Sequence, residues 1–238
     1  MKFQVRLRAC AWLLGCICSL SGWAHDSITT ETRQRFMLTL QQSQQVLAST
    51  TSAVDKAKAH FTMATTLDEI RDLFNEDIQS HGSVNGLESA VLLTELARGG
   101  FTLHKSTHIG LYLSPLDNYR SALSLHPKAG YATLAAYRLF KNQFYDSFTD
   151  NPLKPLSQSR EELTKLLHIG EALLKSKDPI VNQEEVQFIQ AIHTLQAIDQ
   201  QLLSPAEGLK KFKQLLTQLR SQYPQSLKPL TLEALGNL

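Results

Sequence analysis

Apolar residues recur at intervals of three or four along most of the chain. After Ser204, for example, Leu209, Phe212, Leu215 and Leu219 repeat in this way, which places them on one face of a helix. Comparable stripes follow Thr66, Asn85, Ser159 and Asn182. No segment of useful length alternates with the period of two that a half-buried strand would show. The sequence therefore predicts an all-α fold of about nine or ten antiparallel helices, stacked as helix pairs or as an irregular bundle.

Several expected helix starts carry residues that cap free backbone N–H groups. Thr66–Glu69 and Ser159–Glu162 fit the capping box, in which the hydroxyl and the carboxylate each accept a backbone hydrogen bond. Ser204 is followed by Pro205, which suits the first helical position because no donor is lost there. Ser114 follows the same plan, with Pro115 next and Asp117 third, and weaker signals begin at Asn85 and Asn182. These signals predict where the helices begin.

The longest break in the helical pattern is predicted at Asp146–Pro155. Upstream of it, a long first helix is expected from about Thr30 to Met63, straight or bent near Ser49–Ser52. The residues on either side of the break, 25–150 and 156–238, are candidate sub-bundles. Each would be thin alone, so we expect one continuous core.

The first 24 residues have the three parts of a secretory signal peptide. Lys2, Arg6 and Arg8 precede a mostly apolar run, Ala9–Leu20, and small residues then occupy the −3 and −1 positions of a cut after Ala24. The apolar run is about 12 residues, roughly 18 Å of helix, whereas a bilayer core needs about 30 Å. Cleavage is therefore favoured over a retained membrane anchor.

A second kind of processing competes with this cut. Leu13-Leu14-Gly15-Cys16 resembles the lipobox, at which bacterial lipoproteins are cut and acylated on the cysteine. Such a cut would shorten the apolar run to Ala9–Leu14, and Leu14 is bulky for its position. A lipoprotein attached through Cys16 is therefore the second hypothesis.

Removal of residues 1–24 changes the composition. The whole chain has 24 basic and 22 acidic residues, whereas the remaining 214 residues have 21 and 22, a net charge of −1. The three cysteines leave with the signal, which excludes a disulfide scaffold, a thiol oxidoreductase and a covalent c-type haem protein. The charge gives no support for nucleic-acid binding. We expect residues 25–238 to form a single helical domain in a bacterial periplasm, without a membrane span.

Two segments resemble the tetratricopeptide (TPR) repeat. In Tyr119–Pro127, a bulky Tyr119, a small Ala122, then Leu125 and Pro127 stand where the second helix of such a repeat carries them. Phe212–Gly236 is similar to repeats of exported TPR proteins, in which a helix ends in Tyr-Pro-x-Ser and the next carries Ala-Leu-Gly. The resemblance implies stacked helix pairs with a concave binding face and brings no catalytic residues. A helical fold of unrelated origin stays open beside it.

No group of histidines makes a complete metal site. His104 and His108 are spaced i and i+4 on an expected helix, but Lys105 replaces the glutamate of a metalloprotease motif and no third ligand is visible. His168 and His193 each sit one residue off an apolar stripe, where we expect boundary residues. His25 would begin the mature chain. We therefore predict neither a metal nor a cofactor.

Charged residues outside these positions fit structural roles. The pairs Glu161-Glu162 and Glu184-Glu185 fall in expected first helical turns, where negative charge favours the positive end of the helix dipole. Lys210, Lys211 and Lys213 form a small basic face without the interleaved aromatic residues of a strand-binding groove. We interpret it as a solvated helix face.

An aromatic cluster is the one candidate binding region. Tyr137, Phe140 and Phe144 follow helical spacing, with Tyr131 and Tyr145 nearby. This spacing favours core packing over a groove, although the cluster is where a ligand or peptide would first be sought.

The sequence contains no phosphate loop, nucleophile elbow or haem motif. We therefore expect no enzyme, but a non-catalytic interaction or assembly module of the cell envelope with a protein or peptide partner. The alternative is a periplasmic binding protein that holds a small molecule or peptide in an apolar pocket among helices.

Overall fold

A computed structural model describes residues 28–81, 86–101, 103–106, 110–149 and 159–236. It divides into two compact units. The N-terminal unit runs to Leu139, and the described residues of the C-terminal unit run from Phe140 to Gly236. The division lies inside a helix, whereas the sequence placed its candidate boundary at 146–155.

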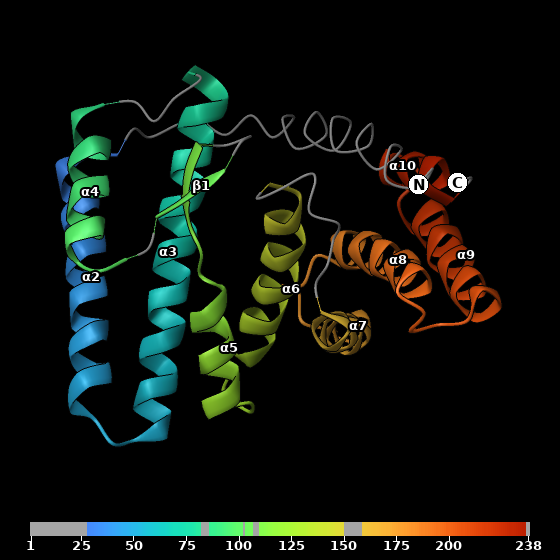
Figure 1. The fold of residues 1–238 in the computed structure, drawn as a ribbon, viewed down its shortest axis with the longest axis horizontal. Coiled ribbons are helices and arrows are strands. Elements are labelled where there is room, and N and C mark those ends of the chain that lie inside the picture. The colour runs from blue at the N-terminus through green and yellow to red at the C-terminus, as the bar shows by residue number, and fades with distance from the viewer. Residues whose placement is uncertain (1–27, 82–85, 102, 107–109, 150–158, 237–238) are drawn as a thin grey trace. The chain divides into compact units, whose positions relative to one another are not determined.

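The fold is all-α, as predicted. The described residues form nine helices and one short hairpin (Figure 1). The helices are α2 (Thr30–Ser49), α3 (Ala53–His81), α4 (Leu87–Arg98), α5 (Leu116–Leu125), α6 (Ala132–Thr149), α7 (Arg160–Leu174), α8 (Gln183–Asp199), α9 (Pro205–Gln222) and α10 (Lys228–Gly236).

The first helix ends much earlier than predicted. Helix α2 stops at Ser49, the chain reverses, and α3 returns alongside it (Figure 1). The Thr50 N–H still bonds the Val46 carbonyl, and the Ser52 hydroxyl then accepts from the Asp55 N–H at 3.3 Å. The hydroxyl-rich segment that was expected at most to bend one helix thus ends one and begins another.

The helix start predicted at Thr66 is wrong. Helix α3 runs through this position without interruption, and the Thr66 hydroxyl donates to the Thr62 carbonyl one turn back. The apolar stripe after Thr66 is correct, because Leu67, Ile70 and Phe74 are buried. The pattern located the buried face but not the end of the helix.

The core of the N-terminal unit is built mainly on α2, α3 and α4, and its fully buried members include Phe36, Leu40, Ile70, Phe74 and Leu92. At its edge, Arg33 of α2 holds two carboxylates of α4: its Nε lies 2.6 Å from Glu88 and its Nη1 2.7 Å from Glu95. The hydrogen bond from Arg33 lowers the pKa of Glu88. These contacts fasten α4 to α2.

The short hairpin was not predicted. Strand β1 (Leu103–Ser106) pairs antiparallel with β2 (Gly110–Leu113), with Leu103 opposite Leu113. Helix α4 stops where Gly99 and Gly100 predicted, and Gly100 has a φ of 79°. Helix α5 then begins at Leu116, and Pro115 at its N-cap makes no side-chain cap, so the predicted cap by Ser114 is wrong.

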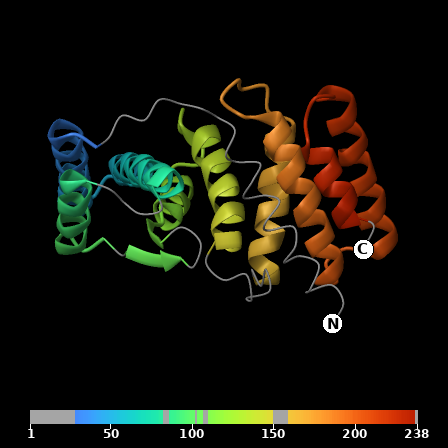
Figure 2. The same ribbon diagram turned by 90° about the horizontal axis from the view of Figure 1, so that it is seen from above.

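In the C-terminal unit, α7 to α10 lie side by side (Figure 2). Three of its predicted helix starts are confirmed. Ser159 and Glu162 form the reciprocal capping box, Ser204 accepts from the Glu207 N–H with Pro205 in the first turn, and Asn182 accepts from the Glu185 N–H. Helix α8 lies against α7, α9 and α10, and every residue from Glu185 to Thr194 is buried.

Candidate functional site

Helix α9 has one packed face and one open face. Phe212, Leu215 and Leu219 are buried. Gly208 lies so close to α8 that a Cβ there would collide with the Ile198 side chain, so the glycine permits this approach. The remaining face of α9 is exposed along its length.

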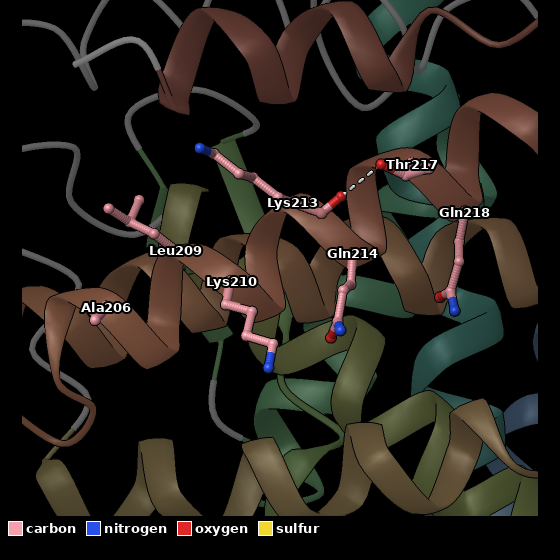
Figure 3. A pocket seen from close by; sticks show the side chains of 7 residues that line it. All are labelled: Ala206, Leu209, Lys210, Lys213, Gln214, Thr217 and Gln218. Atoms are coloured by element: carbon pink, nitrogen blue, oxygen red, sulfur yellow. Dashed lines mark hydrogen bonds between the residues drawn. The ribbon is translucent and has the colours of Figure 1, made fainter.

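The open face borders a surface hollow of about 810 Å³ (Figure 3). One helical stripe of α9 lines it: Ala206, Leu209, Lys210, Lys213, Gln214, Thr217 and Gln218. Leu209 is 41% exposed, which gives the stripe one apolar contact point. The Thr217 hydroxyl donates to the Lys213 carbonyl at 2.9 Å. The stripe thus combines lysine, amide and hydroxyl groups with a little apolar surface.

The cations of α9 differ in their partners. Lys211 is partly buried and pairs with Glu171 of α7, and this hydrogen bond lowers the pKa of Glu171. Arg220 pairs with Glu233 of α10. Within the described residues, the ammonium groups of Lys210 and Lys213 have neither an ion pair nor a hydrogen bond. Both lysines are exposed, so the open face carries two positive charges that no described carboxylate neutralises.

The five aromatic candidates are not brought together around one hollow. Phe140 and Phe144 are fully buried in the C-terminal unit, where Tyr145 donates from its hydroxyl to Glu185 at 3.0 Å. Tyr137 is buried in the N-terminal unit, and Tyr131 stacks on Phe61 there at 4.3 Å between ring centroids. None of the five lines either hollow identified among the described residues. The packed rings of Phe140 and Phe144 leave a ligand no surface to contact.

The histidines fall in different surroundings from those expected. His104 lies in β1, so the expected helix with His108 one turn on is wrong; His108 and His25 lie outside the described residues. His168 is exposed on α7. His193, expected at a boundary, is fully buried instead. Nowhere in the described part of the chain do three or more histidine, cysteine, aspartate or glutamate side chains gather as metal ligands would.

Both carboxylate pairs lie in first helical turns, as predicted. Glu161 is 2.7 Å from Lys165, and this hydrogen bond lowers the pKa of Glu161. Glu184 lies 3.5 Å from Lys228 of α10. The contacts of the two carboxylate pairs therefore include a helix cap and ion pairs.

No family model, no curated protein and no solved structure matches this chain. The TPR resemblance of Tyr119–Pro127 and Phe212–Gly236 therefore stays a prediction. Among the helices of the described residues, none combines the length and the apolar character needed to cross a bilayer.

A row of polar side chains that the sequence pattern did not predict is buried on α8. Gln187, Gln190, His193 and Thr194 are each at most 5% exposed. The apolar stripe predicted for this helix covers one face only, whereas α8 packs against α7, α9 and α10 and is buried on all sides from Glu185 to Thr194. One signal was present: from Val186 to Ile198 the chain contains no Asp, Glu, Lys or Arg, and a surface helix rarely runs so far without a charge.

Proposed function

We propose that the protein is an exported, non-catalytic module that binds a protein or peptide partner in the cell envelope. The observation that carries the proposal is the open face of α9, where Lys210 and Lys213 stand beside the exposed Leu209 at a hollow of about 810 Å³. A partner segment with carboxylates opposite these lysines would neutralise both charges. Complementary charges of this kind direct encounter and set the register of a complex.

The position of this face also supports an interaction role. The opposite side of α9 is fixed to α8 and α10 by Gly208, Phe212 and Leu219. Binding at the open face therefore requires no rearrangement of the core. Pre-organised surfaces of this type lose less conformational entropy on association.

Export is the second part of the proposal, and the signal-like residues 1–24 that support it lie outside the described structure. Expressed in a bacterium with its full leader, the protein should be processed after Ala24, because signal peptidases cut behind small residues. N-terminal sequencing of the exported protein should read His25-Asp26-Ser27. Acylation of Cys16 would instead establish the lipoprotein, and an intact Met1 would contradict cleavage.

The binding surface can be tested by charge reversal. The double variant Lys210→Glu/Lys213→Glu should bind its partner at least about tenfold more weakly, which corresponds to about 1.4 kcal/mol of binding free energy. Affinity capture from envelopes with quantitative mass spectrometry measures the retained partners. The matched control is Lys128→Glu/Lys177→Glu, which reverses two other exposed lysines and should retain wild-type binding.

Two outcomes would count against the proposal. Equal capture by both double variants would show that the α9 face is not the contact surface. A photo-crosslinking residue at Lys213 should give a covalent adduct with the captured partner, and one at Lys177 should give none. The absence of adducts from position 213, together with no enriched protein, would contradict the interaction role itself.

A further inference from the structure

His193 occupies an apolar site without a hydrogen-bond partner. The side chain is 0% exposed, and neither Nδ1 nor Nε2 has a partner within the described residues. The edges of two α6 rings surround it: Phe140 lies 5.2 Å away between centroids at 87°, and Phe144 lies 6.0 Å away at 74°. A neutral imidazole has one donor and one acceptor, so both are buried unsatisfied.

The neighbouring helices approach closely beside this histidine. One turn before it on α8, the Gln190 amide donates to the Leu167 carbonyl of α7 at 3.1 Å. A Cβ on Gly170 of α7 would collide with that amide and would lie 2.9 Å from the Phe140 ring. Parts of α6, α7 and α8 within the C-terminal unit therefore meet with little free space. Protein interiors packed at this density do not readily rearrange to solvate a new charge.

The ionisable groups on the surrounding elements do not offer His193 a counter-charge. The ionisable groups of the adjoining helices include Lys141 and Tyr145 on α6, His168 and Glu171 on α7, Glu185 on α8, Lys211 on α9, and Lys228 and Glu233 on α10. Most bond one another: Lys141 and Tyr145 reach Glu185, and Lys211 pairs with Glu171. Burial is the one cause that lowers the pKa of His193.

We propose that His193 makes the C-terminal unit acid-sensitive, because the contact between α6 and α8 accommodates only the neutral imidazole and opens as the medium becomes acidic. Opening would expose the apolar faces of Phe140, Phe144 and Phe188, which now pack around this site. The inference concerns conformational opening and does not depend on partner binding at α9. It assigns the buried histidine a role as a pH-responsive element.

The direction of the effect follows from the two protonation equilibria. Burial lowers the pKa of His193 to about 3, whereas an exposed imidazole has its ordinary value of 6.5. The closed form is therefore fully stable above pH 6.5 and loses stability as the pH falls from 6.5 towards 3, because only the open form binds the proton. The ratio of open to closed form should approach a tenfold rise for each pH unit below 6.5, which amounts to about 50-fold between pH 6.5 and 4.5.

The two paired carboxylates of α7, Glu161 and Glu171, contribute little in this interval. The bonds to Lys165 and Lys211 lower the pKa values of Glu161 and Glu171 from the ordinary 4.5. Their ion pairs are therefore lost only below about pH 4.5. The interval from pH 6.5 to 4.5 therefore lies above the range in which these two ion pairs are lost.

Hydrogen–deuterium exchange of the full chain tests the proposal. After correction for the intrinsic pH dependence of exchange, peptides from α8 should lose protection about 50-fold between pH 6.5 and 4.5. His193→Leu removes the titrating group and keeps the site apolar, so its corrected protection should stay constant over this interval. His168→Gln, at an exposed histidine of the same unit, should keep the wild-type slope.

The result can overturn the inference in two ways. A wild-type slope near zero would show that His193 does not control opening. A wild-type slope retained in His193→Leu would assign the acid response to other groups. His193→Gln, neutral and polar, serves as a second non-titrating variant if the leucine disturbs folding, and it should also abolish the slope.

Discussion

Replacement of Asp68 by alanine should destabilise the N-terminal unit by about 3–5 kcal/mol. The carboxylate is 3% exposed and lies 2.7 Å from Arg71 Nη2, while the Tyr119 hydroxyl donates to its other oxygen at 2.9 Å. Arg71 is itself 6% exposed. Loss of Asp68 would remove from a buried guanidinium the carboxylate that lies 2.7 Å from it, while Asp72 lies farther away at 3.8 Å. Urea unfolding followed by helical circular dichroism measures the loss.

Glu69→Ala is the matched control. Glu69 is the next residue on α3, and its carboxylate pairs with Arg35 at 2.6 Å on the surface. Exposed ion pairs contribute about 0–1 kcal/mol, so this variant should unfold close to the wild type. A larger loss for Glu69→Ala than for Asp68→Ala would favour a helix start at Thr66 and contradict the continuous α3.

Tyr119 should remain a hydrogen-bond donor to Asp68 over the whole physiological pH range. Burial raises the pKa of its hydroxyl, and the nearby carboxylate of Asp68 raises it further. The cluster therefore joins α3 to α5 through a neutral donor and a charged acceptor. Hydrogen bonds to charged groups are stronger than those between neutral groups. Loss of Asp68 should therefore lower the free energy of unfolding more than loss of the neighbouring Glu69.

The contrast between Thr66 and Ser159 shows what local sequence can establish about helix ends. Both begin the same four-residue pattern, yet Ser159 caps α7 and Thr66 lies inside α3. A capping box satisfies backbone donors only where no preceding turn already supplies acceptors. The local sequence does not reveal whether a helical turn precedes Thr66. The continuous helix is supported by tertiary contacts, such as the hydrogen bond from Tyr119 to Asp68, which lies 51 residues away in the sequence.

The chain reversal at Thr50–Ser52 was missed for a related reason. Helical propensity continues on both sides of these three residues, so a bend and a reversal fit the pattern equally. The reversal is stabilised by Leu40, Met63 and Ile70, which meet in one core only after α3 has folded back on α2. Tertiary burial thus decides between conformations that local propensity leaves close in energy.

The open face of α9 illustrates the opposite case. Its amphipathic stripe is complete in the sequence, and both the buried Phe212 and the exposed Lys213 could be predicted from spacing alone. The burial of His193 could not, because it results from the packing of several helices around α8, with Phe140 and Phe144 of α6 against the imidazole. Periodicity indicates which face of a helix is buried, but it does not predict how many other helices will pack against that helix.

Ala122→Leu should destabilise the protein by about 1–3 kcal/mol, and Ser121→Leu by close to zero. Ala122 is fully buried on α5, which packs against α3. The larger side chain adds three heavy atoms to an interior that is already filled. Ser121 is only partly buried and borders a surface hollow of about 360 Å³ beside His60 and Arg120, so a leucine has room there. Urea unfolding midpoints of the two variants give the comparison.

This pair also tests the register of the TPR-like segment, because the resemblance places the small residue of Tyr119–Pro127 at the helix crossing. The two positions differ by about 100° around α5, so a correct register predicts opposite tolerance at adjacent residues. Equal midpoints would mean that the helix does not cross its neighbour at Ala122. A larger loss at Ser121 would place the other face of α5 against α3 and remove the packing reason for the small residue at position 122.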